Sequence, residues 1–69
     1  MQKQEEPWID VKKLREEKGW TQNEAAKKLG FSRCYLSLVE YRRRGISIKM
    51  MEQIIKIFKV KYEDFYNNQ

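Results

Sequence analysis

Apolar residues in the first part of the chain recur at the spacing of a helix. Trp8, Val11 and Leu14 lie three residues apart, with aspartate and lysine among the residues between them. This spacing favours a helix with one buried face. Gly19 follows, and glycine is the residue best able to end a helix. We therefore predict a first helix over about residues 9–18.

A run of capping residues marks the start of a second helix. Thr21 and Glu24 have the spacing of a capping box, in which a hydroxyl and a carboxylate each accept a hydrogen bond from an unpaired backbone N–H. Two alanines and a leucine follow, and then Gly30, which suits the left-handed conformation that ends many helices. The second helix is predicted over residues 22–29.

A third helix is predicted to begin almost at once. Ser32 is a good N-cap residue, and Phe31 and Leu36 stand at the two positions of a hydrophobic staple. The predicted helix covers residues 33–40. Two short helices joined by so tight a turn form a helix-turn-helix.

The second half of the chain continues the helical pattern. A charged loop, YRRRGIS, leads to Ser47, which can cap a helix over residues 48–58. The apolar positions of that helix form one face: Ile48, Met51, Ile54, Ile55 and Phe58. Val60, Phe65 and Tyr66 indicate a last short helix over residues 62–66. With no strand pattern, the expected fold class is all-α.

Length and composition allow one small domain. The chain has 69 residues, enough for a single core, which we place in residues 8–69; the polar residues 1–7 are expected to form a flexible arm. Cys34 is the only cysteine and there is no histidine, so we expect neither a disulfide nor a metal site. No signal-peptide or membrane-spanning pattern is present, which favours a cytoplasmic location.

Positive charge is concentrated in the middle of the chain. The net charge is +5; residues 1–31 carry seven basic and six acidic groups, whereas residues 33–49 carry five basic and one acidic. A focused basic surface suggests a polyanionic partner, although many small basic proteins bind no nucleic acid.

The predicted third helix has two distinct faces. At about 100° per residue, Tyr35, Leu36 and Val39 fall together. The opposite face holds Arg33, Cys34, Ser37 and Leu38. An α-helix fits the DNA major groove, where arginine can donate two hydrogen bonds to guanine. These four residues are therefore candidate base readers, with Arg33 the strongest; the alternative is an ordinary solvated helix surface.

The combination of motifs resembles the phage Cro and repressor type of helix-turn-helix, the Xre family. The resemblance runs without a gap from Val11 to Phe65, through LREEKGWTQNEAAKKLGFSRCYLSLVE, SIKMMEQIIKIFKV and DFY. Its most specific parts are TQ-x-E-x-A-x-x-x-G and S-R-x-Y-[IL]-S-x-[VIL]-E. It implies a compact five-helix bundle like that of lambda repressor, with the third helix in the major groove and the start of the second helix at the DNA backbone.

The resemblance also assigns roles to residues outside the reading face. Glu40 and Arg15 stand where family members commonly form a structural ion pair. The residues expected to contact phosphates are Gln22, Tyr35, Arg42, Arg43, Arg44 and Lys49. Tyr35 is expected to pack its ring against the bundle as well. Alternatively, Gln22 is an ordinary exposed residue and the arginine run a solvated loop.

Four positions depart from the family pattern. Glycine is usual where Arg42 stands, and Gly45 is expected to take over part of the turn. Leu38 replaces a common polar base reader, so it implies a thymine-methyl contact or less stringent recognition. Lys59 and Lys61 stand where a helix-ending glycine and a capping residue are usual, so the last helix is expected to fray.

The sequence bears on three functional classes: an enzyme, a DNA-binding repressor and a protein interaction module. The chain lacks any catalytic constellation, so we expect no enzyme, cofactor or small-molecule ligand. The expected function is transcriptional repression by operator occupancy, as a homodimer on an inverted repeat of double-stranded DNA. Ile57, Phe65 and Tyr66 would form the dimer interface or else complete the monomer core. The rival hypothesis is a protein interaction module, such as an antitoxin or anti-repressor partner.

Overall fold

The computed structural model describes residues 6–66, and in these residues the fold is all-α. The elements are α1 (Val11–Glu17), α2 (Gln22–Leu29), α3 (Arg33–Glu40), α4 (Ile48–Phe58) and the 3-10 helix η1 (Tyr62–Phe65). The predicted helices 22–29, 33–40 and 48–58 are confirmed. The last predicted helix, over residues 62–66, is present as the short 3-10 helix η1, so the described residues form four α-helices instead of five. Of the predicted arm, residues 1–5 lie outside the described part.

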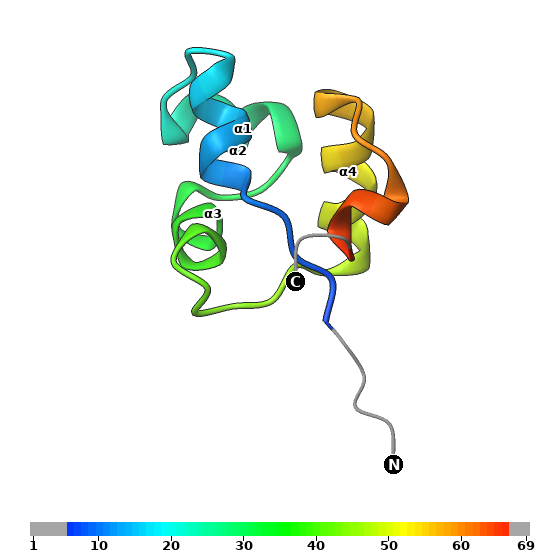
Figure 1. Cartoon of the computed structure of the whole chain (residues 1–69). Coiled ribbons are helices and arrows are strands. Elements are labelled where there is room, and N and C mark those ends of the chain that lie inside the picture. Colours follow the sequence, from blue (N-terminus) through cyan, green and yellow to red (C-terminus); the bar gives the residue numbers. More distant parts are fainter. Residues whose placement is uncertain (1–5, 67–69) are drawn as a thin grey trace.

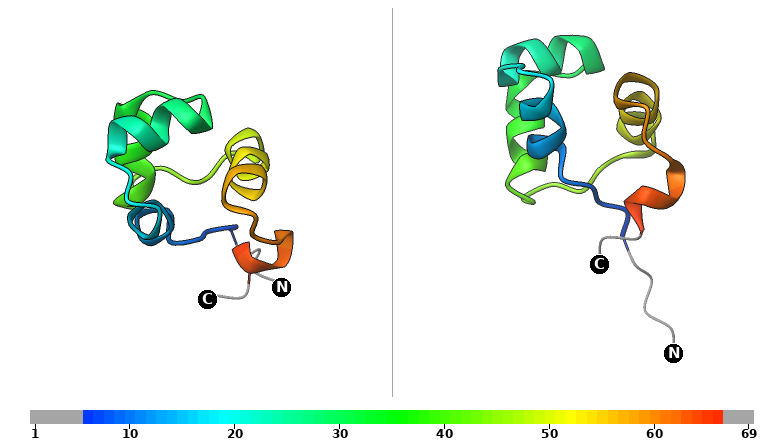
Figure 2. Two further views of the ribbon diagram at one scale, coloured as in Figure 1. Left: turned by 90° about the horizontal axis from the view of Figure 1, so that it is seen from above. Right: turned by 45° about the horizontal axis from the view of Figure 1, so that its top comes forward.

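The helices form two groups that face each other. Helices α1, α2 and α3 pack together, and α4 lies beside them with the chain of residues 41–47 crossing between α3 and α4 (Figure 1). Helix α2 contacts both α3 and α4. The segment before α1 runs past η1, as two further views also show (Figure 2). The start and end of the described chain therefore meet on one side of the bundle.

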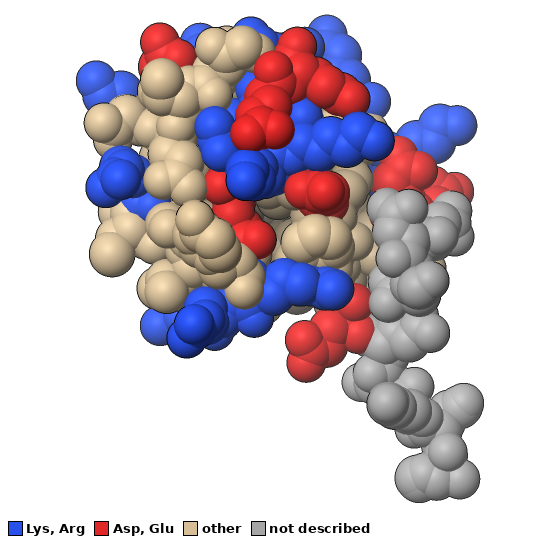
Figure 3. Space-filling view, turned by 60° about the vertical axis from the view of Figure 1, so that its left-hand side comes forward, with Lys and Arg blue, Asp and Glu red and all other residues tan. Residues whose placement is uncertain are grey.

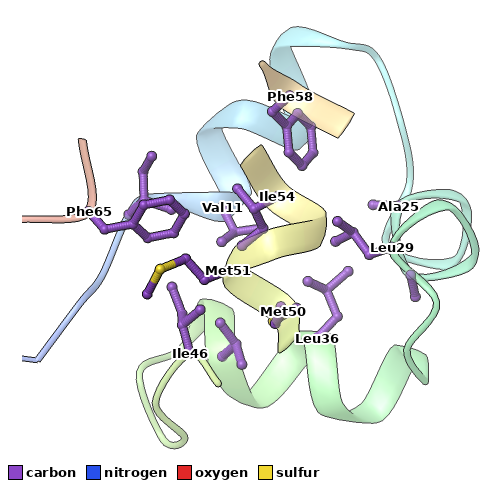
Figure 4. Close-up of a cluster of buried hydrophobic side chains, with 13 residues drawn as sticks. Val11, Ala25, Leu29, Leu36, Ile46, Met50, Met51, Ile54, Phe58 and Phe65 are labelled. Carbon is purple, nitrogen blue, oxygen red and sulfur yellow. The ribbon is translucent and has the colours of Figure 1, made fainter. Parts of the chain in front are cut away.

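The core is apolar and is drawn from every element. Figure 4 shows α4 in the middle of this cluster, with side chains from α2, α3 and the two ends of the chain directed toward it. The buried residues are Ile9, Val11, Ala25, Ala26, Leu29, Leu36, Val39, Ile46, Met50, Met51, Ile54, Phe58 and Phe65. No polar or charged residue in 6–66 is fully buried. Packing of apolar surface thus holds the domain together.

Helix α1 begins later than the sequence pattern predicts. Asp10 is its N-cap and accepts a hydrogen bond from the Lys13 amide at 3.1 Å. Trp8 lies before the helix, where its backbone N–H donates to the Phe65 carbonyl at 2.9 Å. The ring of Trp8 still packs against the core, so Trp8 is an apolar core residue, as its spacing indicates, but it precedes the helix.

One arginine and one lysine adopt the left-handed backbone conformation that glycine usually has at the end of a helix. Arg42 has φ 60° and Lys59 has φ 57°, both in the left-handed region. The expectation that Gly45 takes over part of the turn after α3 is wrong, because the left-handed residue there is Arg42. Despite Lys61, η1 forms: the Asp64 carboxylate accepts from the Lys61 backbone N–H at 2.9 Å.

One apolar residue differs from its predicted placement, and the structure decides between the two alternatives for another. Ile48 was expected on the buried face of α4, yet it is 73% exposed at the first residue of the helix. Phe65 was a candidate for a dimer interface, yet it is fully buried in the monomer core. No helix within residues 6–66 has the length and apolar character to cross a membrane.

Candidate nucleic-acid interface

Helices α2 and α3 are held at a fixed angle by bonds within the turn that joins them. Gly30 ends α2 with φ 82°, and the Phe31 amide donates back to the Ala26 carbonyl at 3.0 Å. Ser32 then caps α3, its hydroxyl accepting from the Tyr35 amide at 3.0 Å. Glycine is favoured at this left-handed position because a side chain there strains the backbone. The turn is therefore short and is closed by hydrogen bonds at the end of α2 and at the start of α3.

Helix α3 separates its side chains into the two faces that the helical projection predicts. Leu36 and Val39 are completely buried against the bundle. On the other face, Arg33 and Cys34 are exposed, Leu38 is 38% exposed and Ser37 is half-buried. Burial of one face fixes the helix rotation, so the four predicted base readers all lie on its accessible side.

An ion pair joins the ends of α1 and α3. Arg15 Nε donates to Glu40 Oε2 at 2.8 Å and Arg15 Nη2 donates to Glu40 Oε1 at 3.2 Å. Arg15 Nη1 also donates to the Trp20 carbonyl at 3.0 Å. Hydrogen bonding to Glu40 raises the pKa of Arg15 above its ordinary value, although burial opposes this. The expected pair at these two positions is thus present, with bidentate geometry.

Gln22 has an intramolecular partner that the sequence did not reveal. Its Nε2 atom donates to Glu40 Oε1 at 2.9 Å. A primary amide has two N–H groups, so one remains for another acceptor. The bond places the Gln22 side chain at the start of α2, next to the end of α3. Glu40 therefore orients both an arginine and a glutamine from two other helices.

Tyr35 connects α3 to the loop that follows it. Its ring lies 5.2 Å from the Phe31 ring, centroid to centroid, and its hydroxyl donates to the Gly45 carbonyl at 3.4 Å. The ring is half-buried, as expected for a residue that packs against the bundle. Its hydroxyl would have to exchange this long hydrogen bond to reach a phosphate.

The three arginines after α3 are exposed, but two of them contact aromatic rings. The Arg42 guanidinium carbon lies 3.9 Å from the Trp8 ring centroid, and that of Arg44 lies 5.9 Å from the Tyr35 ring centroid. These are cation–π contacts, in which the positive group faces the negative ring surface. The sequence carried no signal for the Trp8 contact, since it joins residues far apart in the chain.

The positive charge near α3 is local. Figure 3 shows one face of the molecule, on which lysine and arginine side chains form several groups with acidic side chains between them. Lys49 is exposed in the first turn of α4 and follows the exposed Ile48. The basic excess that the sequence places in residues 33–49 is thus carried by α3, its following loop and the start of α4.

Comparison with known protein families identifies this arrangement. The profile of a family described as Helix-turn-helix matches residues 11–65, which is most of the chain. The chain belongs to this family, a class of DNA-binding regulatory domains. Within it the chain is of the Cro and repressor type, the Xre group, and its fold is lambda-repressor-like. A search of curated proteins found no match.

Membership settles the general function that the sequence motifs predict. The chain is a DNA-binding transcription regulator, and its partner is double-stranded DNA. The family is not typically enzymatic. Helices α2 and α3 are the helix-turn-helix of this domain.

Proposed function

We propose that the chain is a sequence-specific repressor that acts by occupying an operator, with α3 in the major groove. The observation that carries this proposal is the accessible face of α3, where Arg33, Cys34, Ser37 and Leu38 lie together on a helix fixed by its buried side. Arg33 would donate to guanine, Ser37 would bond to a base edge and Leu38 would contact a thymine methyl. Cys34 would serve as a small contact residue.

Contacts to the DNA backbone would set the orientation of α3. Gln22 would donate its second amide N–H to a phosphate, supported by the unpaired N–H groups at the start of α2. Lys49, Arg43, Arg44 and the Tyr35 hydroxyl would complete this set. Such contacts position the protein and carry no sequence information of their own.

We further propose that the protein binds an inverted-repeat operator as a homodimer. One module reads only a short half-site, and pairing two modules matches protein symmetry to operator symmetry. Of the predicted interface residues, Ile57 and Tyr66 are half-buried, whereas Phe65 is excluded by its burial. Tyr62, which is exposed, lies against Tyr66 with a ring-centroid distance of 5.3 Å. A DNA partner implies a cytoplasmic, nucleoid-associated location.

Selection from a randomised duplex pool at two salt concentrations tests the proposal. Wild type should enrich one sequence with two-fold symmetry. Arg33→Ala should relax the preference at one base pair by roughly 1–3 kcal/mol. Arg43→Ala combined with Arg44→Ala should weaken binding to all sequences alike, since phosphates are the same everywhere. Lys56→Ala, which removes an exposed lysine from α4, is the matched control.

The selection experiment distinguishes a DNA-binding repressor from a protein interaction module. Absence of salt-dependent binding by wild type would overturn the proposal and favour a protein interaction module, to which the exposed Ile48 and Tyr41 would contribute. Binding without any sequence enrichment would overturn the assignment of α3 as a base reader. Sedimentation of the complex on the enriched duplex would count the bound copies.

A further inference from the structure

The three arginines after α3 have different environments. Arg42 takes the left-handed backbone conformation directly after the helix. Its amide donates to the Val39 carbonyl at 3.0 Å, and the Arg43 amide donates to the Leu38 carbonyl at 2.8 Å. These two bonds form a Schellman motif, which usually has glycine where Arg42 stands. The arginine is therefore kept here at a cost in backbone strain.

A contact with Trp8 compensates for the backbone strain at Arg42. The Arg42 guanidinium lies over the Trp8 ring at 3.9 Å from the centroid, within the range of a strong cation–π contact. Trp8 is itself fixed, because its backbone bonds to the Phe65 carbonyl and its ring packs against the core. Arg42 thus ties the start of the loop to the segment that precedes α1.

The other end of the loop is tied to α3. Tyr35 donates its hydroxyl to the Gly45 carbonyl, and the Arg44 guanidinium approaches the face of the same tyrosine ring at 5.9 Å. Arg43 lies between these two attachments. Within residues 6–66, its side chain has no ring, hydrogen-bond or ion-pair partner. Its guanidinium is thus the least engaged of the three, and that of Arg44 has only a distant ring contact.

We infer that Arg42 is a positioning residue, whose contact with Trp8 holds the loop so that Arg43 and Arg44 meet DNA phosphates. This inference rests on the proposed function of the α3 face. Arg42 is assigned no phosphate of its own, because its guanidinium stacks on Trp8 at 3.9 Å and is directed to the segment that precedes α1. Arg43 makes the main phosphate contact, and Arg44 makes a second one beside Tyr35.

A double-mutant cycle measured by fluorescence anisotropy tests this division. The probe is a labelled random-sequence duplex, titrated at several salt concentrations. Arg43→Ala should lower the slope of log K against log salt by about 0.9, the value for one phosphate. Arg42→Gly, which suits the backbone at that position, should weaken binding about five-fold when Trp8 is present, and should have little effect in a Trp8→Leu background. Lys56→Gln is the control for general loss of charge.

Opposite results would overturn the inference. If Arg42→Gly weakens binding equally in both backgrounds and lowers the salt slope by about 0.9, Arg42 is itself a phosphate contact. If circular dichroism shows that Trp8→Leu does not fold, a second background is used. Trp20→Phe leaves Trp8 as the only tryptophan. In that background, Arg42→Gly must change the fluorescence emission of Trp8 and leave the salt slope unchanged. A slope lowered in that protein, or an unaltered emission, contradicts the inference. If wild type binds no duplex, the proposed function fails, yet coupling between Trp8 and Arg42 in stability remains measurable.

Discussion

Arg15 and Glu40 lie 25 positions apart in the chain, and their side chains meet through two hydrogen bonds of 2.8 and 3.2 Å. The Arg15 side chain is 11% exposed and that of Glu40 is 2% exposed. Because Glu40 also accepts from Gln22, one carboxylate connects the end of α1, the start of α2 and the end of α3. The orientation of α3 relative to the rest of the helix-turn-helix depends on this carboxylate.

Replacing Glu40 with glutamine should destabilise the fold. Glu40→Gln removes the charge that neutralises Arg15 and leaves a mostly buried guanidinium without an anionic partner. We expect the free energy of unfolding to fall by about 2–4 kcal/mol, measured by urea unfolding. Glu16→Gln, at an exposed position on α1, should change it by less than about 0.5 kcal/mol. Equal effects of the two substitutions would contradict the structural role of the pair.

The stabilising effect of Arg15 should not vary with pH near neutrality. The hydrogen bond to Glu40 raises the pKa of Arg15, so the folded chain holds that proton more tightly than the unfolded chain. A raised pKa contributes stability below the unfolded value and loses it only as pH rises through the folded value. From about pH 7 to about pH 10, the difference in stability between wild type and Arg15→Met should therefore be constant. A clear pH dependence in that range would contradict this assignment.

Lys59→Gly should stabilise the protein. Lys59 ends α4 with φ 57°, and glycine adopts this conformation without the steric cost that a side chain brings. The gain should be about 0.5–1 kcal/mol after the greater freedom of glycine in the unfolded chain is subtracted, seen as a higher melting temperature. Lys56→Gly makes the same change inside α4 and should cost about 1 kcal/mol. A loss in both variants would show that the left-handed turn is not strained.

Alkylation of Cys34 should abolish binding to the selected operator. The thiol is exposed on the accessible face of α3, so N-ethylmaleimide would place a bulky group between the helix and the base edges. We expect about a hundred-fold loss of affinity, or about 2.7 kcal/mol, which is the upper part of the range for one good base contact. Cys34→Ser protein treated in the same way should keep its affinity, and bound duplex should slow the reaction of wild type. Undiminished binding by fully alkylated wild type would place Cys34 away from the DNA.

Phe65→Ala should destabilise the monomer and not merely the dimer. The ring is fully buried among core residues that include Met51 and Val11, as Figure 4 shows. Removal should cost about 3–5 kcal/mol, and the loss should be the same at low and high protein concentration. Tyr62→Ala, in the same turn but exposed, should cost far less. A loss of stability that depends on protein concentration would indicate instead that Phe65 lies in the subunit interface.

The local sequence determined the helices of the DNA-binding element. The caps at Thr21, Ser32 and Ser47, and the stop at Gly30, depend on bonds that span at most five residues. Interactions of this range can be predicted from residue types alone, because no distant part of the chain must arrive first. The spacing of Leu36 and Val39 also fixed which face of α3 would be buried. The motifs in turn predicted the family, which comparison confirmed.

Only the tertiary structure decided which partners the other site residues have. Helical spacing grouped Trp8 with the apolar residues of α1 and placed Ile48 on the buried face of α4, although Trp8 precedes its helix and Ile48 is exposed at a helix start. The bond from Gln22 to Glu40 and the stacking of Arg42 on Trp8 join residues 18 and 34 positions apart. Periodicity reports which face of an element is apolar, but contacts over such separations depend on how the elements pack, so the folded chain alone assigns them.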